Sequence, residues 1–235
     1  MTPVHYAIGD IHGRDDLLEL MHQRIVGHRQ MRFADRDATI VHVGDYIDRG
    51  PDSRAVIDRL MRGVAGFETI CLKGNHEDLM QACLKTDDRD VWWAWLSNAG
   101  DATLASFEVS SRLGRFDPKD LIEALGDDRI TWLCSLPLHY IAGEYLFVHA
   151  GIVPGRPIQQ QQDKDLLWIR YRFLDSEEDH GYRVIHGHTP GDEPVVRPNR
   201  ICIDTTAPLS GRLTAVVLDG DNEPEFLTVQ GEPVR

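Results

Sequence analysis

The chain is 235 residues long, with 42% hydrophobic and 27% charged residues, a composition typical of a globular protein with a sizeable buried core. Its formal net charge of −13 argues against a nucleic-acid binder, because Lys and Arg hold phosphate backbones. The sequence has no run of eighteen apolar residues and no basic leader before an apolar stretch, so we expect a cytoplasmic protein without a membrane span or signal peptide.

The first third of the chain alternates short apolar runs with amphipathic stretches. The apolar runs are typical of strands, and the amphipathic stretches place Leu, Ile, Met and Val at helical spacing. Six segments follow one another, strand then helix: 4–8, 15–30, 38–43, a helix beginning at Pro51, 67–72 and 76–86. This alternation predicts βαβ units and a parallel sheet.

The middle of the chain, 87–136, is predicted to be mostly helical. Three residues interrupt it: Gly100, Gly114 and Pro118. The same region carries three tryptophans: Trp92, Trp93 and Trp95. Because large rings dominate the energetics of burial, we expect this cluster in the core rather than on a binding surface.

After Pro137 the pattern changes to short strands separated by turn residues. The apolar runs are LHYIA, YLFVHA, YRVIHG, RICID and LTAVVLD. They predict a second sheet packed on the first, with EFLTV near the end as an edge strand and 153–164 as a surface loop. No internal repeat or long linker is present, so we expect one domain over 1–235, with 87–136 as a mostly helical insertion.

Five of the predicted strands run into polar clusters: GDIHG (9–13), GDYIDRG (44–50), KGNHE (73–77), HAG (149–151) and HGHT (186–189). In open α/β sheets, ligands bind at the carboxyl ends of strands, so these clusters can converge on one site. Asp, His and Asn suit a divalent ion such as Mn, Fe or Zn. The set exceeds what one tetrahedral ion needs, which indicates two ions sharing a carboxylate, a pair that can clamp a phosphoryl group.

Each cluster also has a simpler interpretation. A Gly-Asp pair after a strand is commonly a turn, and GNHE can be the capped start of a helix. His149 or His186 alone is more often a core histidine. Five such clusters, each directly after an apolar strand, favour one shared site over five unrelated turns.

In this order, the motifs GDIHG, GDYIDRG, GNHE, HAG and HGHT resemble the signature of the PPP-family serine/threonine protein phosphatases, in the compact bacterial and phage branch of the calcineurin-like metallophosphoesterases. The resemblance runs from residue 9 to 189, with the family's last strands continuing to about 219. It implies an α/β fold, a sandwich of two mixed β-sheets flanked by helices. It also implies two divalent ions, with Mn²⁺ expected and Fe or Zn as alternatives.

The resemblance implies six metal ligands: Asp10, His12, Asp45, Asn75, His149 and His186. The first two bind one ion, Asp45 bridges, and the last three bind the second ion, where Asn75 also faces the substrate. A hydroxide bridging the ions is then expected to attack phosphorus directly.

The resemblance further assigns His76 as the general acid for the leaving alkoxide, held and tuned by Asp48, since a neighbouring carboxylate favours the protonated imidazole. Arg49 and Arg170 are expected to clamp the phosphate, because an Arg fork matches its oxygens. Arg172 is the alternative to Arg170 for this role.

Two further motif residues, Glu77 and His188, are expected to be structural or to contact the metal ligands rather than the metals. One segment departs from the family pattern, which tends to read Asp-Thr-Gly-Ala before the last strands. Here Thr206 and Pro208 are expected to stiffen the turn, since Pro fixes φ and Thr rarely adopts positive φ. This change bears on the substrate groove, because no expected ligand is lost.

The predicted activity is hydrolysis of phosphoserine and phosphothreonine in a phosphoprotein or phosphopeptide. The alternatives are symmetrical cleavage of diadenosine tetraphosphate, or hydrolysis of another small phosphoester. By the resemblance, Asp48 favours the first, since the dinucleotide hydrolases usually carry another residue before the Arg. A catalytically silent scaffold would have lost a ligand or His76, and none is missing.

Overall fold

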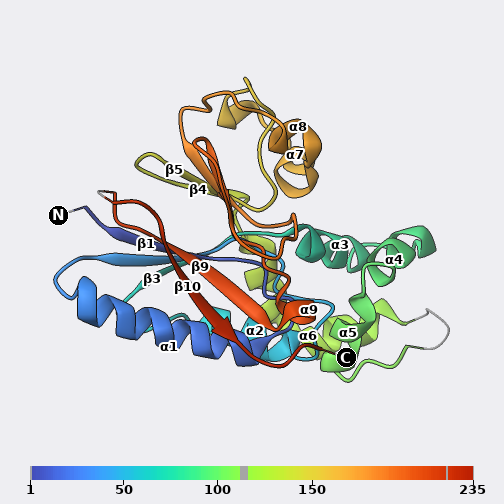
Figure 1. The fold of residues 1–235 in the computed structure, drawn as a ribbon. Helices are drawn as coiled ribbons and strands as arrows, with labels where there is room; N and C mark the ends of the chain where they lie inside the picture. The colour runs from blue at the N-terminus through green and yellow to red at the C-terminus, as the bar shows by residue number, and fades with distance from the viewer. Residues whose placement is uncertain (1, 112–115, 221, 235) are drawn as a thin grey trace.

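The computed structural model describes residues 2–111, 116–220 and 222–234 (Figure 1). The helices are α1 (Asp15–Arg32), α2 (Ser53–Arg62), α3 (Asn75–Cys83), α4 (Arg89–Leu96), α5 (Gly100–Ser106), α6 (Pro118–Ser135), α7 (Asp163–Trp168), α8 (Tyr171–Leu174) and α9 (Ala207–Ser210), with a 3₁₀ turn η1 at Ile158–Gln160. The strands are β1 (Val4–Ile8), β2 (Ala38–His42), β3 (Glu68–Cys71), β4 (His139–Ala142), β5 (Tyr145–Val148), β6 (Arg183–His186), β7 (Val195–Val196), β8 (Arg200–Cys202), β9 (Arg212–Leu218) and β10 (Glu225–Gln230).

The first sheet has the strand order β10-β9-β1-β2-β3. As the alternation predicted, β1, β2 and β3 are parallel, with Val4 opposite Ala38 and Thr39 opposite Glu68. The prediction that the late strands build the second sheet is wrong for β9, whereas β10 is an edge strand as expected, at the edge of the first sheet. β9 pairs antiparallel with the other edge of β1 and so satisfies backbone groups of β1 that are buried there, and β10 pairs antiparallel with β9.

The second sheet has the order β4-β5-β6-β8-β7 and packs face to face on the first. Side chains from both sheets form this interface, among them Ala7, Val41, Phe147, Ile185 and Val216. Both sheets are mixed, which confirms the expected sandwich.

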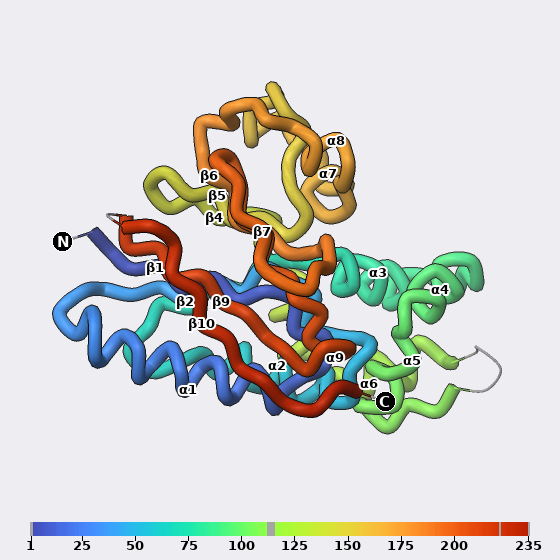
Figure 2. Tube along the Cα trace, viewed as in Figure 1, coloured from blue at the N-terminus to red at the C-terminus, as the bar shows by residue number. Residues whose placement is uncertain are grey.

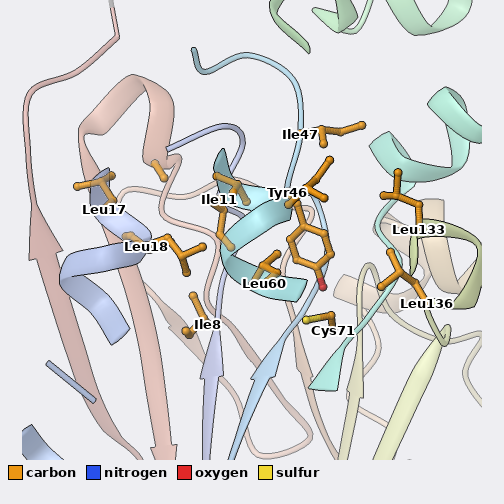
Figure 3. Packing of buried hydrophobic residues seen from close by; sticks show 14 of the residues in the cluster. Ile8, Ile11, Leu17, Leu18, Tyr46, Ile47, Leu60, Cys71, Leu133 and Leu136 are labelled. Atoms are coloured by element: carbon orange, nitrogen blue, oxygen red, sulfur yellow. The ribbon is translucent and has the colours of Figure 1, made fainter. Parts of the chain in front are cut away.

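Helices cover the outer face of each sheet. Beneath the first sheet, α1 and α2 bury Leu17, Leu18 and Leu60 in a cluster with strand residues such as Ile8 (Figures 1 and 3). Against the second sheet, α7 and α8 bury apolar side chains, including Phe173, in a separate cluster. Among the described residues, none of the helices combines the length and apolar character that a bilayer crossing requires.

The predicted helical region 87–136 contains α4, α5 and α6. α4 and α5 lie to one side of the sheets (Figure 2), whereas α6 buries Leu125 and Leu133 in the same cluster as residues of the first sheet. Two of the expected interruptions begin helices, because α5 starts at Gly100 and α6 has Pro118 in its first turn. The third, Gly114, lies outside the described residues. The core prediction is confirmed for Trp95, which is fully buried, and wrong for Trp93, which is 66% exposed.

Candidate metal centre and catalytic site

Strained backbone gathers where the motif loops leave the strands. Positive φ angles occur at His12 (48°), Asp45 (54°), Asp48 (70°), Arg49 (67°) and His188 (63°). Non-glycine residues adopt this region at a cost that the surrounding structure must offset, and such residues cluster at functional sites. The motif loops are therefore held in conformations that the chain would not choose in isolation.

Two groups of buried ligand-type atoms share one carboxylate. In one group, the atoms of His12, Asp45 and His76 lie within 4.8 Å of one another, and in the other those of Asp45, His149 and His188 do. One oxygen of Asp45 is 3.4 Å from His12 Nε2, and the other is 3.3 Å from His149 Nε2. Asp45 is thus arranged as a bridge between the two groups of ligand-type atoms.

The hydrogen-bond pattern tests whether this donor set fits metal ions. His12 Nδ1 contacts the Ile47 carbonyl at 2.8 Å, and His149 Nδ1 contacts the Val43 carbonyl at 2.9 Å. Each Nδ1 therefore carries the hydrogen, and each Nε2 presents a lone pair to the cluster, as in many metal-binding histidines. His149 Nε2 lies 2.8 Å from Asn75 Oδ1. Two acceptor atoms this close repel each other unless a cation lies near them, so the residues fit a metal.

The charges in the cluster favour cations as well. Burial opposes ionisation of Asp45, so its carboxylate needs positive charge nearby. Burial raises the pKa of Asp10, and the carboxyl groups of Asp204 and Asp45 raise it further. Burial also lowers the pKa of His149, which favours the neutral, ligating imidazole. A divalent ion would relieve the crowding of carboxylates.

The turn after β6 also touches Asp10. The backbone N–H of His188 donates to Asp10 Oδ2 at 3.0 Å. A Cβ at Gly187 would collide with Asp10 Oδ1, so only glycine permits this close approach. The loops of the two sheets therefore meet at Asp10.

In the loop after β6, the histidine that lies in the cluster is His188, and the position of His186 does not support its predicted role as a ligand. His188 Nδ1 lies 2.8 Å from Asn75 Oδ1. Along β6, Ile185 faces the sheet interface, so the alternating side chain of His186 points to the outer face, where its ring packs 5.2 Å from that of Phe173. The sequence held a signal for this correction. In the first three motifs the expected ligand directly follows a glycine, as in Gly9-Asp10, and Gly187-His188 repeats that order.

Glu77 holds the loop after β2 to the start of α3. Its carboxylate accepts backbone N–H groups from Asp45 (3.0 Å), Tyr46 (2.8 Å) and Gly74 (2.8 Å) and is fully buried. Burial raises the pKa of Glu77 to about 7 and Asp45 adds to this, while the backbone donors act in the opposite direction. As expected from the sequence, Glu77 has a structural role, which is to fix the backbone of Asp45.

His76 is paired with Asp48 at the edge of the cluster. The Nδ1 atom of His76 lies 2.7 Å from Asp48 Oδ2, and both side chains are buried. Burial alone would lower the pKa of His76, but the carboxylates of Asp45 and Asp48 outweigh it and raise the pKa. The pair is therefore built to keep an imidazole proton available beside the cluster.

Two of the three predicted clamp arginines reach the cluster. Nη1 of Arg49 lies 2.8 Å from His12 Nε2, and Nη2 of Arg49 lies 3.2 Å from His76 Nε2. Arg170 donates to His188 Nε2 at 3.2 Å. Arg172 is exposed and lines a different surface hollow, with Pro154 and Tyr171, which favours Arg170 over its alternative.

The turn at Thr206 differs from the expectation that Thr would avoid positive φ. Thr206 adopts φ 58° and precedes α9, which has Pro208 in its first turn. Its backbone N–H donates to Asp204 Oδ1 at 2.9 Å, and Ser210 Oγ donates to the Thr205 carbonyl at 2.6 Å. These local bonds offset the strain, so Thr206 occupies the left-handed region that the sequence argument expected it to avoid.

Comparisons with known proteins agree with this geometry. The family model described as "Calcineurin-like phosphoesterase" matches residues 6–213. Serine/threonine-protein phosphatase 2 of Escherichia coli (strain K12) is 30% identical over 89% of this chain and 90% of its own. An asymmetrical bis(5'-nucleosyl)-tetraphosphatase, PrpE of Anoxybacillus flavithermus, is 25% identical over 96% of this chain and 93% of its own.

Solved structures show the same fold. A serine/threonine phosphatase from Saccharomyces cerevisiae aligns over 100% of this chain and 85% of its own, with a TM-score of 0.57 at 12% identity. A metallophosphoesterase from Sphaerobacter thermophilus aligns over 99% and 89%, with a TM-score of 0.53 at 18% identity. The chain therefore belongs to the calcineurin-like phosphoesterase family and is a hydrolase of the metallophosphoesterase type.

Proposed function

We propose that this enzyme hydrolyses phosphoserine and phosphothreonine in proteins. The observation that carries the proposal is the buried Asp48–His76 pair beside the cluster. A serine or threonine alkoxide is a strongly basic leaving group, so its departure is assisted by an acid that delivers a proton. A nucleotide leaving from an anhydride is far less basic and has little need of such an acid.

The residues suited to hold two divalent ions are Asp10, His12, Asp45, Asn75, His149 and His188. Ions bound there would supply positive charge for the phosphoryl oxygens and lower the pKa of a bound water. We propose Mn²⁺ as the first metal to test, with Fe and Zn as alternatives, because the mixed carboxylate, imidazole and amide donors suit all three.

The protein's own side chains bind and orient the ester. Arg49 and Arg170 bring guanidinium groups to the cluster, where they can hold phosphoryl oxygens and the charge that develops on them. As a water oxygen forms the new bond to phosphorus, the bond to the ester oxygen breaks and that oxygen keeps the electron pair. It then takes the proton from Nε2 of His76, while Asp48 holds Nδ1.

Cleavage of dinucleoside polyphosphates is the second candidate, favoured by the relatives that carry that name. Besides PrpE, a symmetrical bis(5'-nucleosyl)-tetraphosphatase of Aromatoleum aromaticum is 30% identical over 64% of this chain and 45% of its own. The symmetrical and asymmetrical reactions release different nucleotides, so the products would identify which one applies.

The test is phosphate release from a phosphothreonine peptide with added Mn²⁺, run beside diadenosine tetraphosphate. We expect the peptide to have the higher kcat/KM, by about tenfold or more. A higher kcat/KM for the dinucleotide would overturn the protein-phosphatase proposal and leave the metallophosphoesterase assignment intact. An Asp45→Asn variant is the control for contaminating phosphatases and should be inactive on both substrates.

A further inference from the structure

The helices α4 and α5 reach the proton-donating pair from outside the two sheets. Trp95 donates its indole N–H to Asp48 Oδ2 at 2.9 Å, and Thr103 donates its hydroxyl to Asp48 Oδ1 at 2.5 Å. Between these helices, the Ala99 carbonyl accepts the backbone N–H of Arg49 at 3.3 Å. The helical region therefore contacts two consecutive residues of the site, although none of its described residues supplies an atom to the cluster itself.

We propose that Trp95 and Thr103 are positioning residues, which fix the carboxylate of Asp48 so that it holds His76 in one orientation. A carboxylate with one donor can rotate about its own bond, and the imidazole that it holds can follow. Here both oxygens have a donor from the helical region, and the side chain is fully buried. One arrangement therefore remains, in which Oδ2 meets His76 Nδ1. This inference rests on the proposed function, in which His76 protonates the leaving oxygen.

Close packing holds the ring of Trp95 in one position. It is among the largest fully buried side chains and lies edge-on to Phe116, with ring centroids 5.7 Å apart. A Cβ at Gly100 would come within 2.6 Å of the indole, so this glycine, which begins α5, leaves room for the ring. Packing alone would be satisfied by another aromatic residue. The N–H that meets Asp48 is what the indole adds.

The contacts of Thr103 are also more than packing. Its hydroxyl oxygen accepts the backbone N–H of Asp48 at 2.9 Å, and it shares a hydrogen bond with Ser53 Oγ at 2.9 Å. Asp48 has a positive φ of 70°, and this hydroxyl binds both its backbone and its side chain. Valine has nearly the shape of threonine without the hydroxyl, so it separates the hydrogen bonds from the volume.

The test compares two substrates that differ in the basicity of the leaving oxygen. A phosphothreonine peptide depends on the general acid, whereas p-nitrophenyl phosphate, with a weakly basic phenolate, depends on it much less. Loss of a general acid costs about 10²–10⁴-fold in rate, so loosening one should cost part of this. For Trp95→Phe and for Thr103→Val we expect kcat on the peptide to fall about tenfold, kcat on p-nitrophenyl phosphate to fall at most about twofold, and KM to change little.

Two further variants are matched controls. Trp93→Phe makes the same substitution two residues away on the same helix, at a side chain that is 66% exposed, and should leave both rates as in the wild type. Thr103→Ser keeps the hydroxyl and should recover most of the peptide activity that the valine variant loses. Equal losses on both substrates, or no loss on either, would overturn the positioning role.

A second readout does not need turnover. In the metal-free protein, the proton between His76 Nδ1 and Asp48 should give a far-downfield NMR signal, because it lies in a short hydrogen bond of 2.7 Å. We expect Trp95→Phe and Thr103→Val to shift or broaden this signal and Trp93→Phe to leave it in place. If the wild type fails to hydrolyse the peptide, the proposed function fails, while this signal still decides the positioning role. A signal that is unchanged in both variants would overturn it.

Discussion

The two sheets contribute to the site in different ways. In the loops of the first sheet, buried polar atoms have several partners each, as shown by Glu77 with its backbone donors and Asp48 with donors on both oxygens. Most buried side-chain atoms that lack a partner among the described residues belong instead to the second sheet and its loops: those of His180, Arg183, His186, Thr189 and Arg200, with Thr69 of β3 as the exception.

This difference matches the chemistry that we assign to each side. Proton transfer depends on hydrogen-bond distance and angle, so the side that carries His76 must be fixed in place. Charge–charge interactions weaken slowly with distance. The side that carries Arg170 can therefore tolerate buried side chains with fewer hydrogen bonds. Four predictions test this contrast, in order of decreasing effect.

The largest effect should come from removing the fixed proton donor. We expect His76→Asn to reduce kcat on a phosphothreonine peptide by about 10²–10⁴-fold, since the leaving alkoxide then lacks its acid. The metal content, measured by elemental analysis, should match the wild type. A variant that loses metal would show that His76, which lies in one of the two ligand groups, is a ligand instead.

On the second-sheet side, two histidines separated by one residue should behave differently. His188→Ala removes a cluster atom, so metal affinity should fall by more than the roughly 10–100-fold that loss of an outer partner costs. His186→Ala removes a ring packed on Phe173, so metal affinity should stay near the wild-type value while stability falls. Calorimetric Mn²⁺ titration of both variants makes the comparison. The reverse order of affinities would restore His186 as the ligand.

The backbone attachment of the first sheet can be weakened at Glu77. Glu77→Gln turns an amide N–H₂ toward backbone N–H groups such as those of Asp45 and Tyr46, and leaves buried donors unpaired. We expect the free energy of unfolding to drop by about 2–3 kcal/mol in urea denaturation. Glu123→Gln, the same change at an exposed position of α6, should stay within about 0.5 kcal/mol of the wild type. Equal values for the two variants would contradict the assigned role.

The last prediction concerns the pH dependence of stability through His22. At neutral pH we expect no effect on the unfolding free energy. Burial, assisted by Arg59, lowers the pKa of His22 to about 4, and its Nε2 lies 2.9 Å from that of His42. The unfolded chain accepts a proton near pH 6.5 that the folded protein resists, so the unfolding free energy should fall as pH drops from about 6.5 to 4.

At its steepest this loss approaches about 1.4 kcal/mol per pH unit. His22→Gln should flatten the dependence, as measured by urea denaturation at several pH values between about 4 and 8. An equally steep curve for this variant would show that other groups, with His42 first among them, carry the effect.

The parallel half of the first sheet was predictable because its signals are local. Apolar runs at 4–8 and 38–43 followed by Gly-Asp turns identify strands and their ends without reference to the rest of the chain. Gly74 shows the limit of such signals. A Cβ there would collide with Asp45, and this contact arises only when two loops are packed together.

The sequence by itself determined the strand–helix alternation, the family and the type of donor in each motif, because these depend on residue identity and short-range spacing. Tertiary structure decided which way each side chain faces. It turned His186 to the outer face and His188 to the cluster, and it brought Trp95 and Thr103, some fifty positions away along the chain, onto Asp48. Strand alternation and the packing of distant helices fix these directions, and neither can be read from a motif.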